Sequence, residues 1–192
     1  ANSLWGQAMM ALEFALFQTG PLTMAPSQLG MFAHSDDKAE SPNIEYHVQP
    51  LSLDKFGDPL HRFPAFTASV CNLRPTSRGT IKITDTDPNS APEIAPNYLS
   101  TDRDREVAAN SLRLTRKIVQ QQALQQFEPE EFVPGTQYQS DEELAKAAGD
   151  VGTTIFHPVG TCKMGTADDS SAVVDSRLRV IGLEGLRVVD AS

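Results

Sequence analysis

The sequence has little cysteine, few aromatic residues and a deficit of positive charge. Its 192 residues include only Cys71 and Cys162, too few for a disulfide framework, so we expect a reduced intracellular protein or one indifferent to its redox compartment. Sixteen basic residues stand against twenty-five acidic ones, and the net charge of −9 repels phosphate backbones. Apolar runs stay far below the ~20 residues of a bilayer span. We therefore expect no nucleic-acid partner, no transmembrane segment and a cytoplasmic location, with peripheral membrane association as the alternative.

Glycine patterns that hold phosphates are also missing. No two of the twelve glycines stand one residue apart, which excludes the G-x-G-x-x-G fingerprint of dinucleotide binding. No G-x-S-x-G nucleophile elbow occurs either. Gly160 and Gly165 have the G-x-x-x-x-G spacing of a phosphate loop, but Thr166 stands where the lysine of that motif belongs. The chain by itself is therefore not expected to bind a dinucleotide.

What the sequence contains is a mixture of helical and strand patterns. Apolar residues at helical spacing predict helices over 4–17 and 101–124, each after polar N-cap candidates. A third helix is predicted to begin at Ser140, because Ser140 and Glu143 have the spacing of a capping box.

Alternation of apolar and polar residues predicts strands over 44–48, 66–73 and 80–84. Turn residues at 74–79 indicate that the last two strands pair antiparallel. The proline-bounded stretch 85–96 is predicted to be a loop, and the tail carries strand-like runs at 173–174, 178–181 and 186–189. We expect one α+β domain, whose mainly antiparallel sheet packs against the helices over 4–17 and 101–124.

The densest concentration of reactive side chains is H-P-V-G-T-C-K-M-G at 157–165. His157 precedes Pro158, which pushes the histidine backbone toward extended geometry and helps to hold the ring in one direction. A Cys–His nucleophile pair of His157 and Cys162 is one interpretation, but such pairs meet in space and their spacing in sequence is no support. A copper site of His157, Cys162 and Met164 would need a second histidine that nothing places nearby. We assign no metal ligands.

The same run, with V-V-D-S-R-L-R-V-I-G-L-E-G-L-R-V-V-D-A-S at 173–192, closely resembles the carboxy-terminal part of the glucose-methanol-choline (GMC) family of flavin oxidoreductases, and most of all its choline-dehydrogenase-like alcohol dehydrogenases. Shorter matches occur in the family's order at 77–80, 96–100 and 134–135. The resemblance extends over nearly the whole chain.

The resemblance implies that residues 1–192 form the substrate-binding domain of a larger FAD enzyme, with 173–192 returning toward its amino-terminal FAD-binding domain. It implies that His157 acts as the base, or hydrogen-bond partner, for the hydroxyl of a small alcohol substrate. Pro158 and Val159 would border the flavin ring, and Asp190 and Ala191 would lie near the pyrophosphate. An imidazole suits this role because it can accept a proton near neutral pH.

Two features of the family pattern are absent from the chain. These are the Gly-rich FAD fingerprint and the segment after D-A-S that supplies a second active-site side chain. We therefore expect a fragment that alone neither retains FAD nor turns over substrate, from an enzyme that oxidises a primary alcohol or choline-like substrate to the aldehyde. The alternative is a stand-alone, non-catalytic binding module that has kept the fold. The substrate alcohol and the electron acceptor, oxygen or a quinone, stay open.

Overall fold

The computed structural model describes residues 3–25, 27–55 and 57–192, and the chain divides into two compact units. The first unit comprises Ala1–Ser77 and Leu99–Ala148, and the second comprises Arg78–Tyr98 and Gly149–Ser192. In the described part of the chain, no helix has both the length and the apolar character needed to cross a bilayer.

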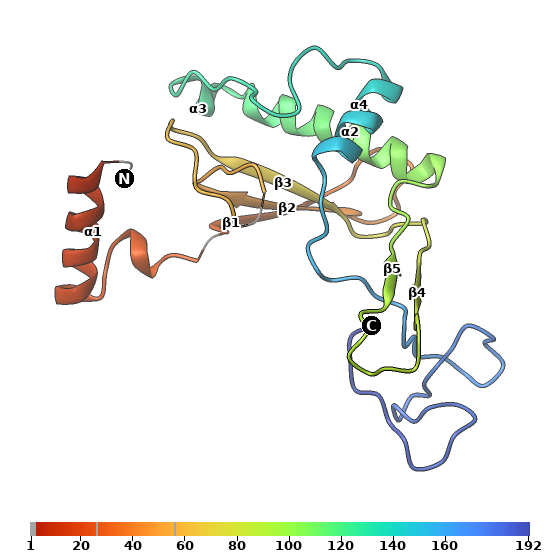
Figure 1. The fold of residues 1–192 in the computed structure, drawn as a ribbon. Helices are drawn as coiled ribbons and strands as arrows, with labels where there is room; N and C mark the ends of the chain where they lie inside the picture. The colour runs from red at the N-terminus through yellow and green to blue at the C-terminus, as the bar shows by residue number, and fades with distance from the viewer. Residues whose placement is uncertain (1–2, 26, 56) are drawn as a thin grey trace. The chain divides into compact units, whose positions relative to one another are not determined.

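The first unit contains a three-stranded antiparallel sheet in the order β1-β2-β3 (Figure 1). The strands are β1 (Leu29–Ala33), β2 (Ile44–Gln49) and β3 (Thr67–Asn72). In the central strand Tyr46 lies opposite Met31 on one side and Val70 on the other. The α+β class with an antiparallel sheet is thus confirmed, and β1 is a strand that sequence periodicity did not indicate.

The core of the first unit lies between this sheet and helix α2 (Asp102–Val119). Ile44, Tyr46 and Val107 are its buried residues, with partly buried apolar side chains around them. The hydroxyl of Tyr46 lies 3.0 Å from Thr115 Oγ1 and also contacts the carbonyl oxygen of Ser111, so its polar end is satisfied. Burial raises the pKa of this tyrosine despite the bond to Thr115.

The helices begin where polar caps satisfy their first N–H groups. Ser3 caps α1 (Leu4–Phe17), and Thr101 caps α2. Ser140 and Glu143 form the expected capping box at α4 (Asp141–Val151), because each side chain accepts a bond from the other's backbone N–H at 3.2 and 3.0 Å. A short 3-10 helix, η1 (Pro21–Thr23), follows α1.

Two expectations about the helices were wrong. The predicted helix over 101–124 is interrupted, since α2 ends at Val119, Gln121 is extended and the short α3 (Gln122–Gln125) follows. No residue of α1 is buried in the described structure, so the expected packing of this helix on the sheet is not found. Helical spacing predicts that a segment is helical, but it does not identify the surface that the apolar side chains cover.

Asp104, in the first turn of α2, holds the turn that follows β3. Its carboxylate accepts bonds from the backbone N–H groups of Thr76 and Ser77, both at 2.8 Å, and from the Thr76 hydroxyl at 3.0 Å. Only 3% of Asp104 is exposed. Burial alone would raise its pKa, but the hydrogen bonds from Ser77 and Thr76 together hold the pKa below its ordinary value.

The second unit contains a two-stranded antiparallel ribbon of β4 (Thr80–Lys82) and β5 (Glu93–Ala95), with Ile81 opposite Ile94. The expected pairing of 66–73 with 80–84 is therefore wrong, as is the assignment of all of 85–96 to a loop. The connecting segment is instead held at the start of α2, because the Asp104 carboxylate accepts the N–H groups of residues 76 and 77.

The tail of the second unit has bridges in place of the expected strands. Val174 pairs with Met164 in parallel and with Val180 antiparallel, and Arg179 pairs with Arg187. Each is an isolated bridge, so the runs predicted at 173–174, 178–181 and 186–189 do not extend into a sheet. Frequent turn residues, including Gly182 and Gly185 with positive φ, end each pairing after one residue.

Candidate active site

The segment 152–163, which holds the sequence-predicted catalytic residue, follows α4 without regular secondary structure. Phe156 has a φ of +62°, a left-handed conformation that is uncommon for a bulky side chain. Gly160 has a φ of +101°, with open space where a Cβ would stand. These two residues bracket 157–159, and they turn the chain before and after it.

His157 is exposed, and within the described residues no hydrogen bond or ion pair holds its ring. Pro158 and Val159 are exposed too, and 74% of Val159 is accessible. A histidine that serves only the structure normally has a hydrogen-bonded ring, and this one is open to solvent. The imidazole nitrogens are therefore available to a molecule that binds against this loop.

The backbone just before His157 is held by hydrogen bonds to one side chain. The N–H of Phe156 donates to Thr154 Oγ1 at 3.0 Å, and the Tyr98 hydroxyl donates to the same oxygen at 3.1 Å. Tyr98 follows β5 in sequence, so the motif at 96–100 contributes directly to the histidine segment. Sequence reasoning missed Tyr98 and Thr154.

The tail returns to the same loop. The backbone N–H of Cys162 donates to the carbonyl oxygen of Ser192 at 3.1 Å. The backbone N–H of Ser192 also donates to the Asp190 carboxylate at 2.8 Å. Hydrogen bonds from the side chain and backbone of Ser192 lower the pKa of Asp190. Of the residues expected at the cofactor, Pro158 and Val159 therefore lie in a loop that is bonded to the stretch containing Asp190 and Ala191.

Lys163 is a third residue whose role the sequence did not reveal. Its ammonium donates to Asp169 and to the Ser171 hydroxyl, both at 2.7 Å, and these bonds hold the polar loop after the motif. Hydrogen bonds from Lys163 and Ser171 hold the pKa of Asp169 well below its usual range. The backbone of Lys163 also accepts bonds from Val173 and Val174 N–H groups. The C-K-M-G part of the motif is thus structural.

The alternative interpretations of the motif gain no geometric support. Cys162 is half-buried, and no hydrogen bond joins its thiol to the imidazole of His157 in the part of the chain that the structure describes. Among the same residues no group of three or more His, Cys, Asp and Glu side chains could hold a metal ion. Cys162 contributes a backbone donor to the loop.

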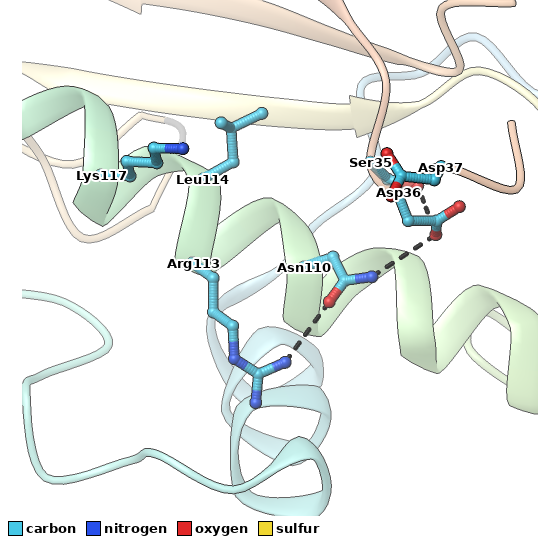
Figure 2. Close-up of a pocket in the computed structure, with 7 residues that line it drawn as sticks. All are labelled: Ser35, Asp36, Asp37, Asn110, Arg113, Leu114 and Lys117. Carbon is cyan, nitrogen blue, oxygen red and sulfur yellow. Dashed lines mark hydrogen bonds between the residues drawn. The ribbon is translucent and has the colours of Figure 1, made fainter.

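A separate hollow in the first unit contains none of the predicted site residues. Figure 2 shows this cavity of about 310 Å³, which lies between the residues after β1 and one face of α2. Asp36, on its wall, binds Arg103 through two hydrogen bonds of 2.7 and 3.2 Å, and Asn110 also donates to it. Arg103 lowers the pKa of Asp36 to about 2. The hydrogen bonds of Asp36 to Arg103 and Asn110 are typical of a structural contact.

Comparison with known proteins adds a family and several relatives. The family described as GMC oxidoreductase matches residues 75–192. The oxygen-dependent choline dehydrogenase 1 of Chromohalobacter salexigens is 38% identical over 98% of this chain and 34% of its own. Thus the chain spans about a third of the length of this curated relative.

Solved structures of similar proteins give a consistent result. Pyridoxine 4-oxidase from Mesorbium loti superposes with a TM-score of 0.76 at 31% identity, over 87% of this chain and 33% of that one. An FAD-dependent oxidoreductase from Chaetomium thermophilum superposes with a TM-score of 0.63 at 27% identity, over 79% of this chain and 24% of that one.

Proposed function

The chain belongs to the GMC oxidoreductase family, and from this premise we propose that residues 1–192 are the substrate-binding domain of an FAD-dependent enzyme that oxidises a primary alcohol or a choline-like substrate to the aldehyde. Its partner is an FAD-binding domain of the same protein, toward which the segment 173–192 returns. A small alcohol is the substrate, with His157 as the base.

The observation that carries the proposal is the exposed imidazole of His157. It lies in the segment that the family match covers, on a loop bonded through Cys162 to the tail, and none of the described residues holds its ring. A base must reach the proton that it accepts within about 3 Å, so a ring with an unoccupied nitrogen is required.

The residues of this chain fit the flavin ring of FAD. Val159, Gly160 and Thr161 are exposed, and no described residue accepts a bond from their backbone N–H groups. With open space beside Gly160, a flat ring system could approach this backbone closely, and its heteroatoms suit N–H donors. In this proposal Pro158 and Val159 border the flavin ring, and Asp190 and Ala191 lie near the pyrophosphate.

The chain does not fit the diphosphate by itself, because it has no Gly-rich turn at a helix N-terminus. We expect purified chain to lose FAD on gel filtration, as absorbance of the eluted protein would reveal. Elution of the chain with one equivalent of FAD would contradict this prediction.

The protein's part in the reaction is proton transfer and orientation. One imidazole nitrogen of His157 accepts a hydrogen bond from the substrate hydroxyl and takes its proton as the C–H bond breaks, a contribution worth ~10²–10⁴-fold. FAD, when bound, supplies the acceptor for the hydride. The rigid Pro158 and the turns at Phe156 and Gly160 restrict the loop, so that the ring meets the substrate in a limited set of orientations.

The test is anaerobic stopped-flow reduction of the flavin in the complete protein, with wild type compared with His157→Ala. We expect the rate to fall by ~10²-fold or more while FAD content stays normal. His47→Ala is the control, since this strand histidine lies in the first unit. An unchanged reduction rate in His157→Ala would refute the assignment.

A further inference from the structure

A hydrogen-bonded chain of three residues leads to the backbone of His157. Tyr98 donates its hydroxyl proton to Thr154 Oγ1 at 3.1 Å, and the same oxygen accepts the Phe156 N–H at 3.0 Å. A hydroxyl oxygen has two lone pairs and can accept both bonds at once. All three residues lie in the second unit.

These bonds act on the least favourable backbone of the segment. Phe156 is aromatic and 72% exposed, and its left-handed backbone conformation is uncommon for a bulky side chain. The next residue is His157, whose position depends on the peptide that Phe156 turns. A bond to the Phe156 N–H is therefore well placed to control where the imidazole lies.

Tyr98 is itself in a constrained turn. Asn97 before it and Leu99 after it both have positive φ, at 56° and 57°. The side-chain amide of Asn97 donates to the carbonyl oxygen of Arg78 at 3.0 Å, which ties the turn to the start of β4. The tyrosine hydroxyl thus comes from a fixed point of the ribbon, while the segment 152–160 has no regular structure of its own.

We propose that Tyr98 is a positioning residue for the reaction: its hydroxyl, through Thr154, holds the left-handed turn at Phe156 that places His157 against the substrate. The inference rests on the proposed function of His157, because a positioning residue requires a catalytic group to position. It assigns no contact between Tyr98 and the substrate.

The experiment compares variants of the FAD-loaded complete protein by two measurements. One is the rate of flavin reduction by the alcohol without oxygen. The other is hydrogen–deuterium exchange of the peptide covering 152–160, without substrate. Tyr98→Phe removes only the hydroxyl. Thr154→Ala removes the acceptor together with the γ-methyl, whereas Thr154→Ser removes the methyl alone and keeps the acceptor. Tyr138→Phe is the matched control, since in the described structure its hydroxyl has no partner.

We expect Tyr98→Phe and Thr154→Ala each to slow flavin reduction by about tenfold or more, because small displacements of a catalytic group are costly, and to speed exchange in 152–160. FAD content should be unchanged, and Thr154→Ser and Tyr138→Phe should resemble wild type. The double variant should lose no more than either single variant, because both act through one bonded chain.

Three outcomes overturn the inference. In Tyr98→Phe, hydrogen–deuterium exchange of 152–160 could be unchanged, or it could be faster while the rate of flavin reduction is unchanged. Thr154→Ser could also reduce the flavin as slowly as Thr154→Ala. If Tyr98→Phe fails to fold, comparison of Thr154→Ala with Thr154→Ser still tests whether the acceptor at residue 154 controls the reduction rate. Failure of the proposed function is separate, because it is the case in which His157→Ala itself leaves reduction unchanged.

Discussion

The backbone N–H of Cys162 donates a hydrogen bond to the carbonyl oxygen of Ser192 at 3.1 Å. This bond joins the two segments that most resemble the family, and it uses no side-chain atom of either residue. A substitution of the Cys162 side chain therefore keeps this bond and tests the thiol alone.

Cys162→Ala in the complete protein should keep flavin reduction within about twofold of wild type. The backbone donor stays, and the thiol makes no hydrogen bond with His157 in the described structure. Stopped-flow reduction of the flavin measures this. A loss of ~10²-fold or more would favour the nucleophile pair of Cys162 and His157 instead.

Asp104→Ala should destabilise the first unit by about 2–3 kcal/mol. The N–H groups of Thr76 and Ser77 would lose a charged acceptor that is itself buried, and hydrogen bonds to a charged group are worth more than neutral ones. Urea-induced unfolding of the 192-residue chain gives the value. Asp102→Ala, in the same helical turn but fully exposed, is the control and should change the midpoint little. Equal effects of the two variants would show that helix-end charge alone matters.

Asp36→Asn should reduce the acid sensitivity of folding. The pKa of Asp36 is about 2 in the folded chain against an ordinary value of 3.8, because Arg103 binds the carboxylate. A lowered pKa stabilises the fold above about pH 4, and the contribution disappears as pH falls toward 2. We expect wild type to exceed the variant by about 1 kcal/mol at pH 6, since solvent screens part of the interaction, and by almost nothing at pH 2.

Urea midpoints of the two proteins between pH 2 and pH 6 measure this difference. The control is Asp37→Asn, which removes a neighbouring carboxylate in the same loop for which no partner is found among the described residues. A difference between wild type and Asp36→Asn that stayed constant with pH would contradict the ion-pair assignment.

Gly79→Ala should destabilise the second unit by about 1–3 kcal/mol. A Cβ at this position would collide with the carbonyl oxygens of Ala95 and Pro96, and both are backbone atoms that cannot move aside without disturbing β5. Gly30→Ala is the matched control, because among the described residues its added Cβ would meet only the Tyr46 carbonyl oxygen, at an ordinary contact distance of 3.8 Å. Hydrogen exchange of the ribbon amides reports the loss. Equal protection in both variants would disprove the predicted clash.

Local signals in the sequence predicted the extent of α1 and the start of α4. The bounds of α1 and the capping box of α4 follow from residues within a few positions of one another, so spacing alone was sufficient. Strand pairing was predicted poorly, because β3 pairs with β2 and β4 with β5, and the turn after β3 is held by Asp104, which lies far along the chain. No periodicity in 74–84 indicates that contact.

The candidate site likewise has residues that the sequence indicated and residues that only the fold reveals. Family resemblance, not spacing, gave His157 its expected role, and that role stays a prediction. Tyr98, Thr154 and Lys163 could not be found because each acts through a hydrogen bond to a residue chosen by the fold. An exposed tyrosine and a threonine in an irregular segment have no sequence pattern that marks them.

The turn at Phe156 also matters for redesign of the protein. The hydrogen bond from the Phe156 N–H to Thr154 Oγ1 uses no side-chain atom of residues 155, 156 or 159, and these three side chains are exposed. A mutagenesis library restricted to Ile155, Phe156 and Val159 would vary the surface beside the imidazole and keep both atoms of that hydrogen bond. Under the proposed function, we expect selection from such a library to change the substrate preference of the complete protein while this hydrogen bond is kept.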